Sequence, residues 1–232
     1  MRVVVLTGAG ISAESGLSTF RDAGGLWEGH DPMQVATPEA FADAPALVQR
    51  FYDERRAALS RVRPNAAHHA LVRLEQALGE DLLVVTQNVD DLHERAGSAR
   101  VHHIHGRLRS AWCTTCHERH EWDGPLGHAP PCPWCGEATL RPDIVWFGEI
   151  PYGMDLVERA LADCDLFVSI GTSGIVYPAA AFVHWARGAT LELNLEPSEG
   201  ATDFDRSRQG PATQLVPAWV DELLGTESRT SS

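Results

Sequence analysis

The 232-residue chain contains no lysine, because all 19 of its basic side chains are arginine. This absence excludes catalysis through a lysine Schiff base and phosphate binding by a P-loop lysine. The 32 acidic side chains give a formal net charge of −13 at pH 7. Nucleic acids and anionic membranes both require a basic face, so we expect neither among the partners, although a locally positive pocket is compatible with this composition.

The chain also lacks long apolar runs, since none approaches the roughly 20 residues that a membrane-spanning helix requires. The opening stretch MRVVVLTGAG passes from a short apolar run into a glycine-rich loop, unlike a signal peptide. The five cysteines are an odd number, which favours a reducing compartment over a full set of disulfides. We therefore expect a cytoplasmic protein, long enough to bury a core in one domain with or without a small insert.

Short apolar segments that read as buried strands alternate with helix-like stretches along most of the chain. The predicted strands are Val3–Thr7, Leu82–Thr86, Leu166–Gly171 and Thr190–Leu195, and the predicted helices include Ala66–Leu78, Met154–Ala162, Pro178–Arg187 and Pro217–Leu224. This alternation is typical of an α/β protein with a parallel sheet and right-handed crossovers. Ligands of such sheets bind beyond the carboxyl ends of the strands, so the polar residues after each strand are candidate site residues.

Two regions interrupt the alternation and predict a second, smaller lobe. Residues 22–65 carry no strand signal but hold a helix around FYDERR, and residues 107–147 hold four paired cysteines. On a helical wheel Arg55 falls with Tyr52 in the centre of the apolar arc, whereas Arg56 points elsewhere. A buried arginine needs a counter-charge. An internal carboxylate and the carboxylate of a ligand are both open at this point.

The paired cysteines lie in CTTC and CPWC, which are separated by fifteen residues: Cys113, Cys116, Cys132 and Cys135. This spacing predicts four thiolates around one Zn²⁺ ion; a pair of disulfides or unligated thiols is the alternative. With every ligand position used, the zinc is structural and replaces a core that so small a module cannot build. Cys164, at the start of a strand, is predicted to be a buried free thiol.

A glycine-rich turn follows the first strand, with Gly8, Gly10 and Ala13 spaced as G-x-G-x-x-A. Such a turn lets backbone amides approach a pyrophosphate. The motif is weak alone, since the usual acidic residue after a second strand is missing.

Polar groups also follow the other strands. Gln87, Asn88 and Asp90 suit an amide or a ribose, although Asn88 or Asp90 capping a helix is an equal alternative. In VHHIHG, His103 and His105 share a face, and His105 is a plausible general base, although a lone histidine is more often structural.

The last two strands end in GTS and NLE. Their side chains Thr172, Ser173, Asn194 and Glu196 suit phosphate and ribose hydroxyls, with Glu196 taking the carboxylate role that is missing earlier. Four strand ends therefore converge on one polar crevice, which is stronger evidence than any single motif.

Seven segments occur in one order: GAGISAESGLSTFRDAGGLW, TQNVDDLHERAG, IHG, the CxxC pairs, VWFGE, GTS and NLEP. Together they closely resemble the sirtuins, which are NAD-dependent protein-lysine deacylases, over residues 3–224. The resemblance implies a Rossmann-like parallel-sheet NAD-binding lobe (1–21, 75–106 and 148–224) within one domain spanning residues 1–232. It also implies a smaller lobe, made of a helical module (22–74) and a four-cysteine zinc ribbon (107–147). The polar composition of the tail GTESRTSS predicts disorder over residues 225–232.

The resemblance also implies roles for individual residues, with His105 as the catalytic base and Asn88 as its catalytic partner. The implied NAD contacts are Gly8, Ala9, Gly10, Ser12, Ala13, Phe20, Arg21, Trp27, Gln87, Asn88, Asp90, Gly171, Thr172, Ser173, Asn194, Leu195, Glu196 and Ala212. The implied substrate contacts are Tyr52, Arg55, Ala36, Val145, Phe147, Gly148 and Glu149. Val145–Glu149 resembles a strand that pairs with the substrate backbone.

In the implied reaction the acyl oxygen of a modified lysine attacks the ribose carbon that bears nicotinamide, and His105 then takes a proton from a ribose hydroxyl. NAD is consumed as a co-substrate, and the products are nicotinamide, O-acyl-ADP-ribose and free lysine. Tyr52 and Arg55 match the Tyr-x-x-Arg motif of class III sirtuins, which remove succinyl, malonyl and glutaryl groups, and Ala36 leaves room for a longer acyl chain.

Three alternatives stay open. The chain is mainly a lysine deacetylase, or it is a mono-ADP-ribosyltransferase that uses the same nicotinamide-release step, or it is a non-catalytic NAD-binding or zinc-ribbon module. The expected partners are acylated lysine side chains of proteins, and the expected oligomeric state is a monomer.

Overall fold

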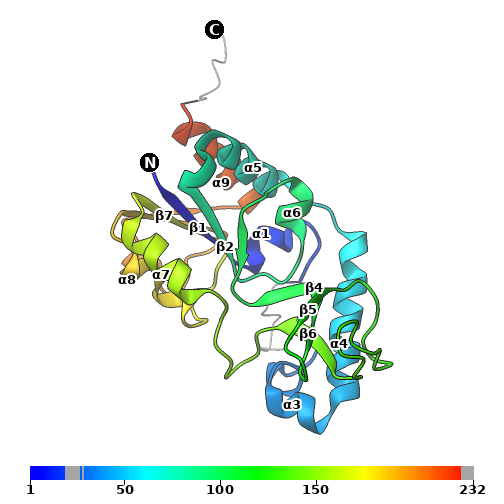
Figure 1. The fold of residues 1–232 in the computed structure, drawn as a ribbon. Helices are drawn as coiled ribbons and strands as arrows, with labels where there is room; N and C mark the ends of the chain where they lie inside the picture. The colour runs from blue at the N-terminus through cyan, green and yellow to red at the C-terminus, as the bar shows by residue number, and fades with distance from the viewer. Residues whose placement is uncertain (19–26, 28, 226–232) are drawn as a thin grey trace.

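Six short parallel strands form the central sheet of the computed structural model, which describes residues 1–18, 27 and 29–225 (Figure 1). Their order is β3-β2-β1-β7-β8-β9. The strands are β1 (Val3–Thr7), β2 (Leu82–Thr86), β3 (Val101–His103), β7 (Leu166–Ile170), β8 (Ala189–Asn194) and β9 (Arg206–Gln209). The apolar run of β1 is buried throughout, as expected for a strand covered on both faces. The predicted α/β class is therefore confirmed.

Helices cover both faces of this sheet (Figure 1). Successive side chains of a strand point to opposite faces. Val3 and Val5 accordingly pack with α5 (Ala66–Leu78) and α9 (Ala212–Leu223), whereas Val4 and Leu6 pack with α7 (Met154–Asp163) and α8 (Phe182–Trp185). The shorter elements around the sheet are α1 (Ala9–Ala13), α6 (Leu92–Ala96), η2 (Gly79–Asp81), η3 (Ala179–Ala181) and η4 (Ala201–Asp203).

Some predicted boundaries differ from the observed ones. The structure puts all of α5 on the sheet, whereas the boundary proposed between residues 74 and 75 divides this helix. Helix α9 begins at Ala212, five residues before the predicted start, because Pro217 lies inside the helix. Strand β9 escaped prediction because its sequence, RSRQ, is polar and lies at the sheet edge.

The smaller lobe combines a helical module with an antiparallel sheet. The helices are α2 (Pro32–Val35), α3 (Pro38–Asp43), α4 (Pro45–Ala58) and η1 (Leu59–Arg61), and the strands β4 (Gly106–Cys113), β5 (Arg119–Glu121) and β6 (Leu140–Ile144) pair in the order β5-β4-β6. The apolar face of α4 packs Val48, Phe51 and Tyr52 against Leu108 of β4 and Ile144 of β6. The predicted apolar arc of this helix is therefore the seam between module and ribbon.

The helical wheel was wrong about Arg56, which is also buried, with 3% of its surface exposed. Its guanidinium donates to the carbonyl oxygen of Leu108 at 2.6 Å, to that of Gly124 at 3.2 Å and to the Asp53 carboxylate at 2.7 Å. Asp53 in turn accepts the backbone N–H of Leu126 at 2.8 Å. The zinc ribbon wraps a second flank of α4, and this tertiary contact is invisible to helical periodicity.

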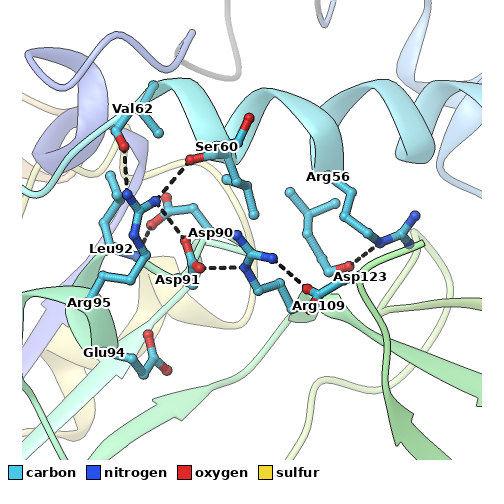
Figure 2. Close-up of polar contacts among 12 residues, drawn as sticks. Arg56, Ser60, Val62, Asp90, Asp91, Leu92, Glu94, Arg95, Arg109 and Asp123 are labelled. Atoms are coloured by element: carbon cyan, nitrogen blue, oxygen red, sulfur yellow. Dashed lines mark hydrogen bonds and ion pairs between the residues drawn. The ribbon is translucent and has the colours of Figure 1, made fainter. Parts of the chain in front are cut away.

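Ion pairs tie the two lobes together at the start of α6, as Figure 2 shows. Arg95 donates to the carbonyl oxygens of Leu59 and Val62, at 2.9 and 2.7 Å, and so holds the end of the α4–η1 segment. Asp91 accepts from both Arg95 and Arg109, the second of which lies on β4. The carboxylate of Asp91 therefore joins the sheet lobe to β4, and its partner Arg95 joins the sheet lobe to the α4–η1 segment.

Three further predictions concern Cys164, membrane-spanning helices and the C-terminal tail. Cys164 is a buried free thiol, as predicted, and lies 3.2 Å from the carbonyl oxygen of Leu161. Among the residues that the structure describes, no helix has the length and apolar character needed to cross a membrane. Most of the predicted disordered tail, residues 226–232, lies outside the described residues.

Replacing Arg56 by methionine is expected to lower the free energy of unfolding by about 3 kcal/mol, because it leaves a partly buried Asp53 carboxylate and two carbonyl groups without their donor. Urea unfolding of the zinc-loaded protein measures this loss. Arg50→Met is the matched control, since Arg50 is exposed on the same helix. Equal losses in the two variants would show that Arg56 does not anchor the ribbon.

Candidate functional site

A cleft of about 1240 Å³ lies at the carboxyl ends of the central strands. Strands β1 and β7 are neighbours in the sheet, but the chain leaves β1 toward β2 on one side and leaves β7 toward β8 on the other. Such a switch point opens a crevice beyond the strand ends. Gly8, Gln87, Gly171 and Asn194, which follow or end four strands, all line the cleft. The predicted convergence is thus confirmed.

The glycine-rich turn after β1 lies directly against the end of β7. The N–H of Gly10 donates to the carbonyl oxygen of Gly171 at 2.9 Å. A Cβ on Gly10 would lie 2.6 Å from the Cα of Gly171, and Gly171 itself has a φ of +64°. No other residue type fits either position without displacing backbone. The absence of a Cβ at these two positions therefore allows the turn to lie against β7, where Gly8, Gly10 and Gly171 line the cleft.

Asn88 braces this turn from the end of β2. Its amide nitrogen donates to the carbonyl oxygen of Gly8 at 3.1 Å and to the Ser12 hydroxyl at 3.2 Å. Ser12 donates in turn to Asp90 at 3.0 Å, and the other Asp90 oxygen accepts the N–H of Leu92. The N-cap residue of α6 is Asp91, so neither Asn88 nor Asp90 occupies the cap position, although Asp90 accepts the N–H of the first helical residue. Burial raises the pKa of the Asp90 carboxyl.

His105 lines the cleft in the turn after β3. Its Nδ1 lies 3.1 Å from the carbonyl oxygen of Gln87, which requires a proton on Nδ1 and leaves Nε2 as the basic nitrogen. Burial lowers the pKa of His105, and the hydrogen bond to Gln87 opposes that shift. The next residue, Gly106, has a φ of +83°, and a Cβ there would lie 2.0 Å from the carbonyl oxygen of Asp143. The orientation of the His105 ring is therefore fixed by its bond to Gln87 and by the close backbone approach at Gly106.

The other two histidines of VHHIHG form hydrogen bonds with groups inside the protein. His103 uses both ring nitrogens internally, toward the Asn88 carbonyl oxygen at 2.9 Å and Glu94 at 2.7 Å. His102 contacts the carbonyl oxygen of Tyr152 at 2.9 Å. Of these three histidines, His105 is the one that lines the cleft, whereas His103, predicted to share its face, bonds to Asn88 and Glu94.

His68 and His93 form a buried pair that was not predicted from the sequence. The two rings make an edge-to-face contact at 5.0 Å behind the glycine-rich turn, and His93 lies 3.0 Å from the Thr7 hydroxyl. Burial lowers the pKa of His68 to about 4 and also lowers the pKa of His93 well below its usual range, so both rings are neutral. They come from two helices, and only the fold brings them together.

Tyr52, Arg55 and Ala36 line the opposite end of the cleft, on the smaller lobe. The Arg55 guanidinium carbon lies 3.3 Å from the centroid of the Phe51 ring and 4.7 Å from that of Trp27, a cation–π arrangement that stabilises a buried charge. One Arg55 nitrogen also donates to the Phe51 carbonyl oxygen at 2.9 Å. The predicted charged side chain on an apolar helix face is therefore present.

The segment Val145–Glu149 forms a turn, not the predicted strand, because β6 ends at Ile144. The N–H of Val145 donates to the carbonyl oxygen of His105, and that of Phe147 donates to Ala36, both at 2.9 Å. These bonds connect the turn to the two ends of the cleft. The Glu149 carboxylate is bound to Arg141 at 2.8 and 3.0 Å and to the N–H of Trp146 at 2.9 Å, so its side chain holds the turn in place.

The third side of the cleft lies beyond β7 and β8. Asn194 donates to the carbonyl oxygen of Thr172 at 2.6 Å, which joins the two strand ends. Ser173, Leu195 and Glu196 are exposed there. Other predicted contacts that line the cleft are Ala9, Ala13, Trp27, Val145, Phe147, Gly148 and Ala212. The predicted contacts Phe20 and Arg21 lie outside the described residues.

The four paired cysteines come together in the ribbon, with their sulfurs within 4.8 Å of one another. The Sγ atoms of Cys113 and Cys135 are 3.7 Å apart, and those of Cys116 and Cys132 are 3.8 Å apart. These separations are too long for disulfides. They match the edge of a tetrahedron with Zn–S bonds of about 2.3 Å, which is about 3.8 Å. The cysteines are thus positioned to bind one structural zinc ion.

The hydrogen-bonding environment of these thiols favours the thiolate at one of the four positions. The backbone N–H of Cys116 and the Thr139 hydroxyl lower the pKa of Cys113 to about 5. Thiolates are the form that zinc binds.

The family model described as "Sir2 family" matches residues 8–178. An NAD-dependent protein deacylase of Caulobacter vibrioides is 56% identical over 231 residues, which cover 97% of each chain. A solved Sir2 homolog–NAD complex superposes with a TM-score of 0.88 at 39% identity, covering 98% of this chain and 91% of the other. A solved Sir2 bound to acetylated peptide gives a TM-score of 0.81 at 26% identity, covering 97% and 94%.

Replacing Cys132 by serine is expected to abolish zinc binding and to lower stability, because the ribbon that buries Arg56 depends on the four sulfurs. The purified protein is expected to contain one zinc ion per chain, released by a thiol-modifying reagent and measured with a colorimetric chelator. Cys164→Ser is the control and retains its zinc. A wild-type protein without zinc, or a Cys132→Ser variant that keeps it, would contradict the assignment.

Proposed function

The chain belongs to the Sir2 family, and we propose that it removes acyl groups from lysine side chains of proteins while consuming NAD. The observation that carries this proposal is the cleft, in which a positioned neutral histidine and a glycine-lined turn face Tyr52 and Arg55. The name of the Caulobacter vibrioides relative and the NAD held by the Sir2 homolog structure support it.

The residues present fit the co-substrate. The turn of Gly8 and Gly10 lines the cleft and lets a pyrophosphate approach the backbone closely, and the exposed Ser173 and Glu196 suit ribose hydroxyls. Asn88 and Asp90 place compact hydrogen-bonding groups between the turn and His105. Bound NAD supplies a ribose carbon from which nicotinamide leaves, and no hydride moves.

In this proposal His105 acts as the general base. Its Nδ1 proton is committed to the Gln87 carbonyl oxygen, so Nε2 accepts a proton from a ribose hydroxyl. The lowered pKa keeps the ring neutral near pH 7. Asn88 keeps the turn and the end of β2 together, which positions the ribose against His105.

At the other end of the cleft, Arg55 and Tyr52 bind the distal carboxylate of a succinyl or malonyl group. A guanidinium forms charge-assisted and often bidentate bonds with a carboxylate, and the Tyr52 hydroxyl provides another donor. Burial raises the pKa of Tyr52, so its proton is present at every working pH. The small side chain of Ala36 leaves space for the longer acyl chain.

Replacing His105 by alanine is expected to abolish NAD-dependent deacylation while NAD still binds. In the wild type, kcat/KM is expected to fall at acid pH with an apparent pKa below 6.5, because the protonated imidazole cannot accept a proton and burial shifts that pKa downward. Mass spectrometry of O-acyl-ADP-ribose and calorimetry of NAD binding measure the two effects. His69→Ala, on the exposed side of α5, is the control. Unchanged turnover would remove His105 from the mechanism, and ADP-ribosylated protein as the product would indicate a transferase.

Replacing Arg55 by methionine is expected to lower the ratio of desuccinylation to deacetylation by about a hundredfold, since losing one partner of a partly buried charge pair costs about 3 kcal/mol. The measurement is kcat/KM for acetyl-, malonyl-, succinyl- and glutaryl-lysine in one peptide sequence. Arg50→Met leaves the ratio at its wild-type value. If Arg55→Met lowers all four values equally, Arg55 stabilises the folded protein and does not bind the acyl carboxylate. The chain is then a deacylase without an acidic-acyl preference.

A further inference from the structure

Trp146 is part of the turn at 145–149 and contacts Tyr52 at the acyl end of the cleft. We propose that Trp146 is a specificity-determining residue, because its indole N–H fixes the direction in which the Tyr52 hydroxyl donates. This inference rests on the acyl-lysine function proposed above and assigns a role to a residue that does not carry the charge itself.

The contact is a single hydrogen bond of 3.0 Å from the Trp146 Nε1 to the Tyr52 oxygen. An indole N–H only donates, so the Tyr52 hydroxyl is the acceptor. A phenolic hydrogen prefers the plane of its ring, where it has two positions, and the indole occupies the direction of one of them. The hydroxyl hydrogen therefore takes the other position and is available to a second acceptor. Tyr52 borders the cleft, and its side chain is fully buried, with 0% of its surface exposed.

Trp146 is itself held on three sides, which makes it a rigid support. The Arg141 guanidinium carbon lies 3.4 Å from the centroid of the Trp146 ring, and Phe41 lies 5.3 Å from it. The backbone N–H of Trp146 donates to Glu149. Only 2% of the surface of Trp146 is exposed, so its ring has one orientation.

A buried ion pair holds this support. Arg141 is 5% exposed and binds both oxygens of Glu149, at 2.8 and 3.0 Å, while donating to the carbonyl oxygen of Ile144 at 2.7 Å. The order of contacts is therefore Arg141, Glu149, Trp146, Tyr52. Each step is a hydrogen bond or a ring contact between buried or half-buried groups, and the last one ends in the acyl pocket.

The consequence is specific to acidic acyl groups. A succinyl or malonyl group presents a carboxylate that accepts the Tyr52 hydrogen, whereas an acetyl group ends in a methyl group and has no use for it. Without the indole N–H, the hydroxyl hydrogen has two positions, and binding the carboxylate requires selecting one of them and leaves a lone pair without a donor. Loss of the Trp146 donor therefore lowers the discrimination between acyl groups.

The test is a double-mutant cycle of Trp146→Phe and Tyr52→Phe, read as the ratio of kcat/KM for succinyl-lysine to that for acetyl-lysine in one peptide. Phenylalanine keeps an aromatic ring beneath Arg141 and removes the N–H. Trp146→Phe is expected to lower the ratio about tenfold, mainly through KM for the succinyl peptide. In the Tyr52→Phe background the same change is expected to leave the ratio within about twofold, because the hydroxyl it orients is gone.

An equal effect of Trp146→Phe on both acyl groups, or an effect on the ratio that is undiminished in the Tyr52→Phe background, would overturn the proposal and assign Trp146 a packing role. If Trp146→Phe does not fold, Glu149→Gln tests the same contacts. This change weakens the ion pair between Arg141 and residue 149 and is expected to lower the ratio. An unchanged ratio counts against the proposal.

The Arg55→Met variant separates this failure from failure of the proposed function. A ratio that responds to Arg55→Met but not to Trp146→Phe leaves the acidic-acyl function standing and removes Trp146 from it. A wild-type protein without succinyl-lysine activity removes both.

Discussion

The contact on which the rest of the structure depends is the backbone contact between the glycine-rich turn after β1 and Gly171 at the end of β7. It lies at the switch point of the sheet, where the chain leaves two neighbouring strands in opposite directions. Because Gly10 and Gly171 have no Cβ, the turn approaches β7 to hydrogen-bonding distance. Asn88 then bonds to the turn from β2, and His105 bonds to the residue before Asn88. One close approach thus sets the positions of the groups on three strand ends.

The smaller lobe places two buried arginines on one helix, one at the cleft and one at the zinc ribbon. Helix α4 uses both flanks: Arg55 stacks on aromatic rings at the cleft, and Arg56 binds the carbonyl oxygens of the zinc ribbon. The ribbon is too small to hold such a helix by apolar burial alone, so four clustered sulfurs replace a core. The position of Arg55 in the cleft therefore depends on the metal site, although the two lie in different parts of the lobe.

Much of this arrangement was predictable from the sequence, because its signals are local. Apolar runs predict buried strands, and CxxC pairs predict a metal site. Polar residues that follow parallel strands lie at the same edge of the sheet. Contacts between distant segments carry no such signal. Arg56 looks like a surface residue on a helical wheel, His68 and His93 meet only in the fold, and Glu149 matches a substrate-binding motif yet binds Arg141. Strand β9 is polar because it lies at an edge, where one face and one row of hydrogen bonds meet solvent.

Burial favours the uncharged form of five titratable groups that lie in the cleft or behind its glycine-rich turn. It raises the pKa values of Asp90 and Tyr52 and lowers those of His68, His93 and His105, which in every case favours the uncharged form. Burial does not deprotonate a guanidinium, because the pKa of arginine lies far above the pH at which proteins work. Arg55 therefore keeps its positive charge at the cleft, beside an uncharged Tyr52. The absence of lysine from the chain sharpens this point, since a buried ammonium would lose its proton where a guanidinium does not.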